Sequence, residues 1–211
     1  MKSLMKKHIG MVLITFLPML LSCATTLPGR QYTQGNIIDV GHFSVIGPPG
    51  DGWFVNIQKR QGEVKFEKRN LSQSTGLINA STTMIVSRRR VEDKKLRSLS
   101  EEEFADAYRE DEWQSLIKVS GKKGMPEYFD VKKGTTAIGD KKIYYMSYRA
   151  SGWIKAVKHT CEGMLYLFLP ADFEERHFFY WFWIEQIIAE DYLGGFDLTP
   201  IIPVINSLQL K

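Results

Sequence analysis

The hydrophobic pattern over most of the chain has the two-residue period of β-strands. Several segments alternate apolar with polar side chains or are rich in β-branched and aromatic residues, and glycine or proline separates many of them. We expect strands at His42–Ile46, Trp53–Gln58, Val64–Lys68, Ser81–Ser87, Tyr128–Thr135, Lys142–Tyr148 and Ala156–Leu169. The first two flank a turn sequence at 47–52, which predicts that they pair with each other.

A further apolar segment, Phe178–Ile188, begins with six consecutive aromatic residues. A buried helix and a strand both fit this segment, but the aromatic run favours a strand. If this strand lies at the centre of the sheet, both of its faces are buried. If one face is open, alternate aromatic rings of 178–183 are exposed and could bind a glycan, a lipid or another protein.

Two helices are expected to cover the sheet. Ser100 and Glu103 form a capping box ahead of an acidic first turn, and Phe104 begins the buried stripe, which continues with Ala107 and Tyr108. The segment Leu198–Leu208 has the spacing of a short amphipathic helix. The sequence therefore predicts an α+β fold, with an antiparallel sheet flanked by helices on both faces.

The N-terminal segment has the organisation of a secretory signal. A basic start, Met1–His8, precedes an apolar run, Ile9–Leu21, that gives roughly 20 Å of helix against the roughly 30 Å needed to cross a bilayer. The next residues, Leu20-Leu21-Ser22-Cys23, resemble the lipobox of bacterial lipoproteins. That resemblance implies a diacylglycerol on the Cys23 thiol, cleavage before Cys23, and palmitate on its amino group. The alternative is an ordinary signal peptide with a chance cysteine.

The lipobox also divides the chain. Residues 1–22 are the expected signal peptide, 23–36 the lipidated cysteine with a flexible tether, and 37–211 a single globular domain. Ala24 stands where aspartate would signal retention in the inner membrane of enterobacteria, so the resemblance implies the periplasmic face of the outer membrane. With Cys23 lipidated, only Cys161 is left, and no disulfide can form within the chain.

Net charge argues against one class of partner. The chain has 28 basic and 24 acidic residues, and removal of the signal takes away three lysines and no acid, which leaves 25 against 24, or +1. A nucleic-acid-binding domain normally presents a basic footprint. We therefore expect no nucleic-acid partner. We expect a membrane contact through the acyl chains, and an envelope protein as the partner.

Short motifs in the presumed domain resemble those of the PsbP-like family. They are Pro-Gly-Asp-Gly-Trp at Pro49 to Trp53, the helix start Ser100 to Phe104, Leu169-Pro170, and the closing Ile-Asn-Ser-Leu at Ile205 to Leu208. The resemblance implies an α/β/α sandwich that serves as a docking or accessory module. It carries no active-site residues over to this chain.

One pair of residues could support catalysis. His159 and Cys161 lie two apart on an expected strand, so their side chains share a face at the spacing of a thiolate–imidazole pair. The alternative is a structural thiol, because cysteine is among the residues most often buried. The sequence contains no zinc, nucleophile-elbow or phosphate-loop pattern, so we expect no metal and no cofactor.

Charge is unevenly distributed along the sequence. The segment 88–97 carries Arg88, Arg89, Arg90, Lys94, Lys95 and Arg97 against two acids, whereas 101–112 carries seven acids against one arginine. These six basic residues could contact anionic headgroups or an acidic protein. The alternative is a solvated loop that the acidic helix neutralises.

Two functional hypotheses follow. The first is a lipid-anchored envelope protein that acts as a non-enzymatic binding or accessory module. The second is an envelope thiol enzyme or hydrolase that uses Cys161 with His159.

Overall fold

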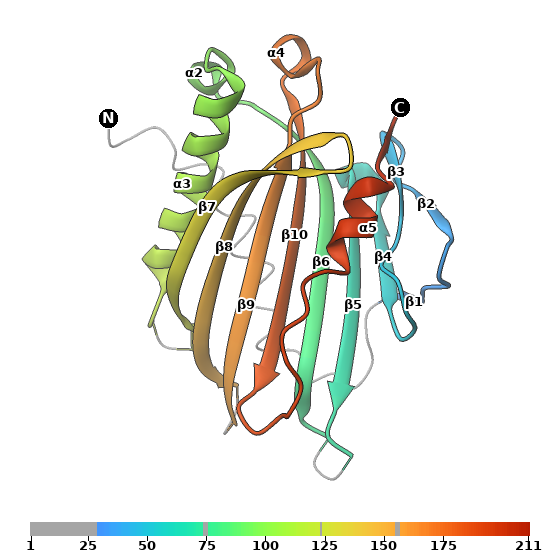
Figure 1. The fold of residues 1–211 in the computed structure, drawn as a ribbon, viewed down its shortest axis with the longest axis vertical. Coiled ribbons are helices and arrows are strands. Elements are labelled where there is room, and N and C mark those ends of the chain that lie inside the picture. Colours follow the sequence, from blue (N-terminus) through green and yellow to red (C-terminus); the bar gives the residue numbers. More distant parts are fainter. Residues whose placement is uncertain (1–28, 74–75, 123, 155–156) are drawn as a thin grey trace.

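An eight-stranded antiparallel sheet forms the centre of the computed structural model, which describes residues 29–73, 76–122, 124–154 and 157–211 (Figure 1). In spatial order its strands are β1 (Arg30–Gln31), β4 (Phe54–Gln58), β5 (Glu63–Leu71), β6 (Ile78–Arg90), β10 (Phe178–Ala189), β9 (Val157–Phe168), β8 (Lys141–Ile154) and β7 (Glu127–Ile138). The signal peptide, Cys23 and the first part of the expected tether lie outside the described residues. The chain is mostly antiparallel sheet with a few helices, which confirms the α+β class.

The aromatic segment is a strand, as expected, and it is buried on both faces. β10 pairs with β6 on one edge and β9 on the other, so its backbone polar groups are satisfied within the sheet. Phe179, Trp181 and Trp183 enter one hydrophobic core, whereas Tyr180 and Phe182 enter the other. Five of the six rings are therefore buried. The alternative that β10 offers an open aromatic surface is wrong.

One face of the sheet is covered by α3 (Glu101–Val119), which follows the short helix α2 (Lys94–Arg97). The expected capping box is present: the Ser100 hydroxyl accepts from the Glu103 amide, and the Glu103 carboxylate accepts from the Ser100 amide. Phe104 is buried as expected, but Ala107 and Tyr108 are only half-buried.

The buried face of α3 also contains an arginine, Arg109, which the hydrophobic pattern does not predict. Arg109 is 4% exposed, and its Nη1 donates to the Gly134 carbonyl at 2.5 Å and to the Tyr145 carbonyl at 3.0 Å. These hydrogen bonds attach the helix to β7 and β8 and satisfy a guanidinium that burial would otherwise penalise.

The opposite face is covered by a second, three-stranded sheet together with α5 (Ile201–Asn206), and not by helices alone. In this small sheet β3 (Phe43–Ile46) lies between β2 (Ile37–Asp39) and β11 (Gln209–Leu210). The expectation that the first two strands pair is wrong, because the turn at 47–52 carries the chain from the small sheet to β4 in the large one. Two short elements, η1 (Lys59–Gln61) and α4 (Phe173–Arg176), complete the fold.

The folded domain begins earlier than residue 37. Arg30 and Gln31 pair with Val55 and Phe54, and the amide of Tyr32 donates to the Trp53 carbonyl at 2.8 Å. Gly29 has φ +146°, and a Cβ there would lie 2.6 Å from the Val55 carbonyl oxygen, so the close approach requires glycine. Residues 29–36, expected as part of the tether, therefore belong to the domain.

Among the helices of the described segments, none combines the length and the apolar character that a membrane crossing requires.

Phe104→Ala should lower the free energy of unfolding by about 3 to 5 kcal/mol. The Phe104 ring is 1% exposed and lies 4.9 Å from the Phe173 ring and 5.3 Å from the Phe179 ring, so its removal leaves a cavity between α3 and β10. Denaturant titration measures the change. Ile117→Ala on the same helix is the control: this side chain is 40% exposed, and its loss should cost much less.

Candidate functional site

The basic segment is not a loop, and its side chains point in different directions. Arg88, Arg89 and Arg90 form the end of β6, so successive side chains lie on opposite faces of the sheet. Arg89 lies under α3, where its Nη1 donates to the Tyr108 hydroxyl at 3.3 Å and its guanidinium lies 4.2 Å from the centre of the Trp181 ring. This half-buried arginine therefore acts within the fold.

The other basic residues divide into bound and exposed groups. The Arg88 guanidinium lies 3.6 Å from the centre of the Phe178 ring, and the Arg97 Nε donates to the Val91 carbonyl at 2.8 Å. Arg90, Lys94 and Lys95 are exposed. A contact between these three residues and an anionic surface stays a prediction, but the six basic residues do not form one continuous site.

A triple change to Ser at Arg90, Lys94 and Lys95 should reduce association of the unlipidated chain with anionic vesicles at low salt. These exposed positive charges attract anionic lipid, and salt screens the attraction. The fold should be unchanged. Vesicle sedimentation and a thermal melt measure the two effects. Arg89→Ser is the contrast: it should lower the free energy of unfolding by about 2 kcal/mol, because it removes the contacts with Tyr108 and Trp181. Unchanged vesicle binding in the triple variant would show that the segment has no electrostatic role.

His159 and Cys161 share the α3 side of the sheet, but the structure does not activate the thiol. Both ring nitrogens of His159 lie near backbone carbonyls, Nδ1 2.9 Å from Val157 and Nε2 3.2 Å from Ile78. Burial, and then the nearby Glu185 carboxyl, raise the pKa of the Cys161 thiol well above its ordinary value. A reactive cysteine needs a lowered pKa. The cavity beside Cys161 has a volume of about 20 Å³, which is room for roughly one water molecule.

A buried carboxyl, Glu185, is a titratable group near Cys161 that sequence reasoning missed. It is 1% exposed on β10, and its Oε2 accepts from the Tyr148 hydroxyl at 2.8 Å, which in turn accepts from the Trp183 Nε1 at 3.0 Å. The other oxygen, Oε1, makes no conventional hydrogen bond with the described part of the chain, although the weakly donating Cys161 thiol interacts with the same carboxyl. The signal in the sequence was a single glutamate within the apolar run 178–189.

A glycine makes the contact between Tyr148 and Glu185 possible. Tyr148 and Glu185 both pair with Gly163 of β9, from opposite sides, so the three residues form a row across the sheet. A Cβ at Gly163 would collide with the Tyr148 ring. The absent side chain therefore lets the ring lie across β9 and bring its hydroxyl to the carboxyl.

Burial raises the pKa of Glu185 to about 8, despite hydrogen bonds from Tyr148 and Cys161 that lower it. In the unfolded chain the carboxyl releases its proton near its ordinary pKa of 4.5, whereas the folded protein retains it up to about pH 8. This group therefore stabilises the fold fully below about pH 4.5, and the stabilisation is lost as the pH rises through 8.

Glu185→Gln should remove the loss of stability at rising pH, because glutamine has the shape of glutamate and stays neutral. The free energy of unfolding of the wild type should fall relative to the variant by on the order of 1 kcal/mol per pH unit within that window. Denaturant titrations at about pH 5 and about pH 8 measure the difference. Glu174→Gln, at an exposed glutamate of α4, is the control and should follow the wild type. Parallel pH profiles for wild type and Glu185→Gln would contradict the assignment.

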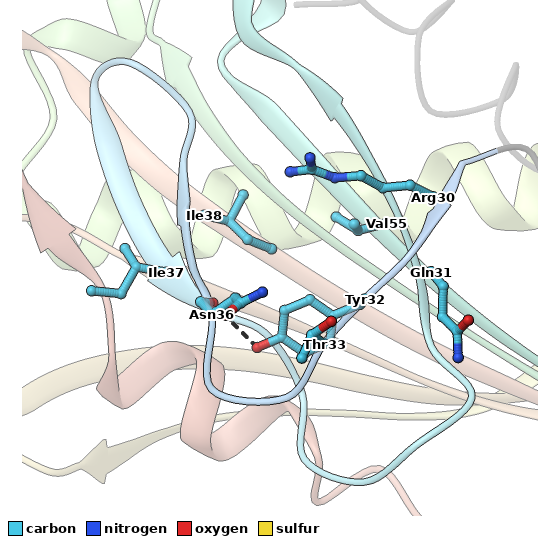
Figure 2. Close-up of a pocket in the computed structure, with 8 residues that line it drawn as sticks. All are labelled: Arg30, Gln31, Tyr32, Thr33, Asn36, Ile37, Ile38 and Val55. Atoms are coloured by element: carbon cyan, nitrogen blue, oxygen red, sulfur yellow. Dashed lines mark hydrogen bonds between the residues drawn. The ribbon is translucent and has the colours of Figure 1, made fainter.

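A cavity lies where the described part of the chain enters the domain. A cleft of about 300 Å³ opens between β1, β4 and the start of β2, and Figure 2 shows its lining. Its apolar part consists of Tyr32, Ile38 and Val55, all buried. Its polar and exposed part consists of Arg30, Gln31, Thr33, Asn36 and Ile37. This size is at the lower end of the range of small-molecule pockets.

Tyr32 holds the cleft in shape. Its hydroxyl accepts from the Gly47 amide at 2.9 Å and donates to the Asn36 carbonyl at 3.3 Å (Figure 2). Its ring meets Phe66 edge-on, at 5.7 Å between ring centres. The cleft is therefore fixed by contacts with the core of the domain.

Arg30 and Ile37 give the cleft an amphipathic rim. The Arg30 side chain is exposed, and its guanidinium makes no hydrogen bond or ion pair with the residues that the structure describes. Ile37 is 66% exposed and lies directly opposite Ile46, which is 39% exposed, so the two form an apolar pair on the outer face of the small sheet. The arrangement can accept a negative charge beside an apolar surface.

No protein-family model matches the sequence, and no curated protein matches it either. Among solved structures, LpqN of Mycobacterium tuberculosis, described as involved in cell envelope biogenesis, matches with a TM-score of 0.46 and 8% sequence identity. The match covers 83% of this chain and 89% of the LpqN chain. The PsbP-like resemblance stays a prediction.

Proposed function

We propose that this protein is a lipid-anchored component of the bacterial cell envelope that acts as a non-enzymatic binding or accessory module. The observation that carries the proposal is the lipobox-like Leu20–Cys23 behind a secretory signal, followed after a few residues by a folded domain. Two or three acyl chains would hold such a protein on a bilayer almost irreversibly, since each buried methylene contributes about 0.8 kcal/mol.

The short connection orients the domain. Seven residue steps separate Cys23 from Arg30, and a fully extended chain of that length spans at most about 25 Å. The part of the domain that contains β1 therefore stays close to the bilayer in which Cys23 is anchored. The remaining faces are available to a protein partner.

We further propose the outer membrane, on its periplasmic face, as the location, and an envelope protein as the partner. Ala24 after Cys23 supports the location through its resemblance to outer-membrane lipoproteins. The near-zero net charge of the mature chain supports a partner other than nucleic acid.

The thiol-enzyme hypothesis receives less support. The raised pKa of Cys161 and the two backbone contacts of the His159 ring disfavour a thiolate–imidazole pair.

Cys23→Ser should abolish lipidation and leave the chain as an uncleaved or soluble precursor. Membrane fractionation, with mass spectrometry of the N-terminal peptide, measures both effects in a bacterial host. Thr25→Ala is the matched control and should be processed like the wild type. An unmodified N-terminus at a residue other than Cys23 in the wild-type protein would overturn the proposal.

A further inference from the structure

We propose that the cleft between β1 and β2 binds the headgroup of an anionic phospholipid from the bilayer in which Cys23 is anchored. The inference rests on the proposed function, because the anchor supplies both the membrane and the proximity. It adds a specific lipid site that neither the signal nor the lipobox implies.

The position of the cleft favours this occupant. Arg30 and Gln31 line the cleft and are also the first paired residues after the tether. An acylated Cys23 therefore keeps the cleft within about 25 Å of the bilayer surface, at a permanently high local concentration of headgroups.

The lining matches the chemistry of a headgroup. Arg30 supplies a guanidinium, which binds phosphate through two parallel hydrogen bonds, and the side chain of Asn36 offers a further polar group. The Arg30 guanidinium has no partner among the described segments, so a phosphate would not have to displace an existing ion pair. Figure 2 shows Ile38 and Val55 between Arg30 on one side and Tyr32 on the other.

The nearest acid of the small sheet does not counteract Arg30 directly. Asp39 at the end of β2 accepts from the Lys211 Nζ at 2.7 Å, and its other oxygen lies 3.8 Å from the Lys59 Nζ. The hydrogen bond from Lys211, the hydrogen bond from the Gly41 amide and the charges of the two lysines lower the pKa of Asp39 to about 2. The carboxylate is thus already matched by two cations.

The exposed isoleucines extend the site toward the acyl chains. Ile37 at the edge of the cleft and Ile46 beside it form an apolar surface on the outside of the small sheet. A bilayer gives such a surface an apolar environment next to the phosphate layer. One lipid could therefore contact both parts of the rim, with its phosphate at Arg30 and its apolar part at Ile37 and Ile46.

The test measures hydrogen–deuterium exchange of residues 30–38 in the mature lipidated protein. The protein is anchored either in vesicles of phosphatidylcholine alone or in vesicles of phosphatidylcholine with phosphatidylglycerol. We expect exchange of this segment to be several-fold slower with phosphatidylglycerol. Arg30→Gln should abolish the difference, and Ile37→Ser should reduce it.

Arg60→Gln is the matched control. Arg60 is also an exposed arginine without a partner in the described segments, but it does not line the cleft, so the variant should behave as the wild type. Thermal melts of the variants check that the fold is intact. Equal exchange in the two kinds of vesicle, or an equal effect of Arg30→Gln and Arg60→Gln, would overturn the proposal. The same protection from inorganic phosphate in phosphatidylcholine vesicles would also overturn it, because the site would then bind free anions.

A second arm separates this site from the anchor. The full Cys23→Ser chain is titrated with dihexanoyl phosphatidylglycerol, a soluble short-chain lipid, and Arg30→Gln in that chain should weaken binding roughly tenfold. If the short-chain lipid binds but Cys23 of the wild-type protein carries no lipid, the proposed anchor is wrong and the proposed headgroup site is supported. If Cys23 is lipidated but neither experiment detects binding of phosphatidylglycerol, the proposed headgroup site is wrong and the proposed anchor is supported.

Discussion

The burial of β10 on both faces is the constraint on which the rest of the fold depends. Large aromatic side chains alternate between the two sides of this strand, and its edges are occupied by β6 and β9. Each aromatic ring removed from water contributes a large apolar area, so both faces require a covering layer. α3 provides one layer, while α5 and the three-stranded sheet provide the other. Short segments from both ends of the described domain, β2 and β3 on one side and α5 and β11 on the other, complete this second layer.

The same strand, β10, also places a carboxyl group inside the hydrophobic core. Glu185 lies at a position where an apolar side chain would avoid the cost of burying a carboxyl. The Tyr148 hydroxyl and the retained proton reduce that cost, and Gly163 provides the space that the tyrosine needs. A polar contact across three strands also favours one register, because a shift of β9 by one residue would place a side chain under the tyrosine ring.

Charged residues in this protein act according to where the fold places them. Arg89 and Arg109 are held under α3 by tyrosine, tryptophan and backbone carbonyls, so they stabilise the packing of the helix on the sheet. Arg30 carries the same guanidinium but stands at an open cleft beside exposed isoleucine. The proposed lipid contact therefore rests on Arg30, and the density of basic residues along the sequence is a poor guide to it.

Local sequence alone predicted the long strands, helix α3 and the proposed processing signal. The two-residue period, the Ser100–Glu103 capping box and the lipobox-like segment involve residues within a few positions of one another. Only the tertiary structure decided that β3 pairs with β2 and β11, that residues 29–36 belong to the domain, and that Glu185 is buried. The cleft could not be predicted for the same reason: 24–36 has the composition of a linker, whereas residues 30–32 are held by contacts with Val55 and Gly47. These outcomes depend on contacts between residues far apart in sequence, whose burial and pairing a local pattern does not contain.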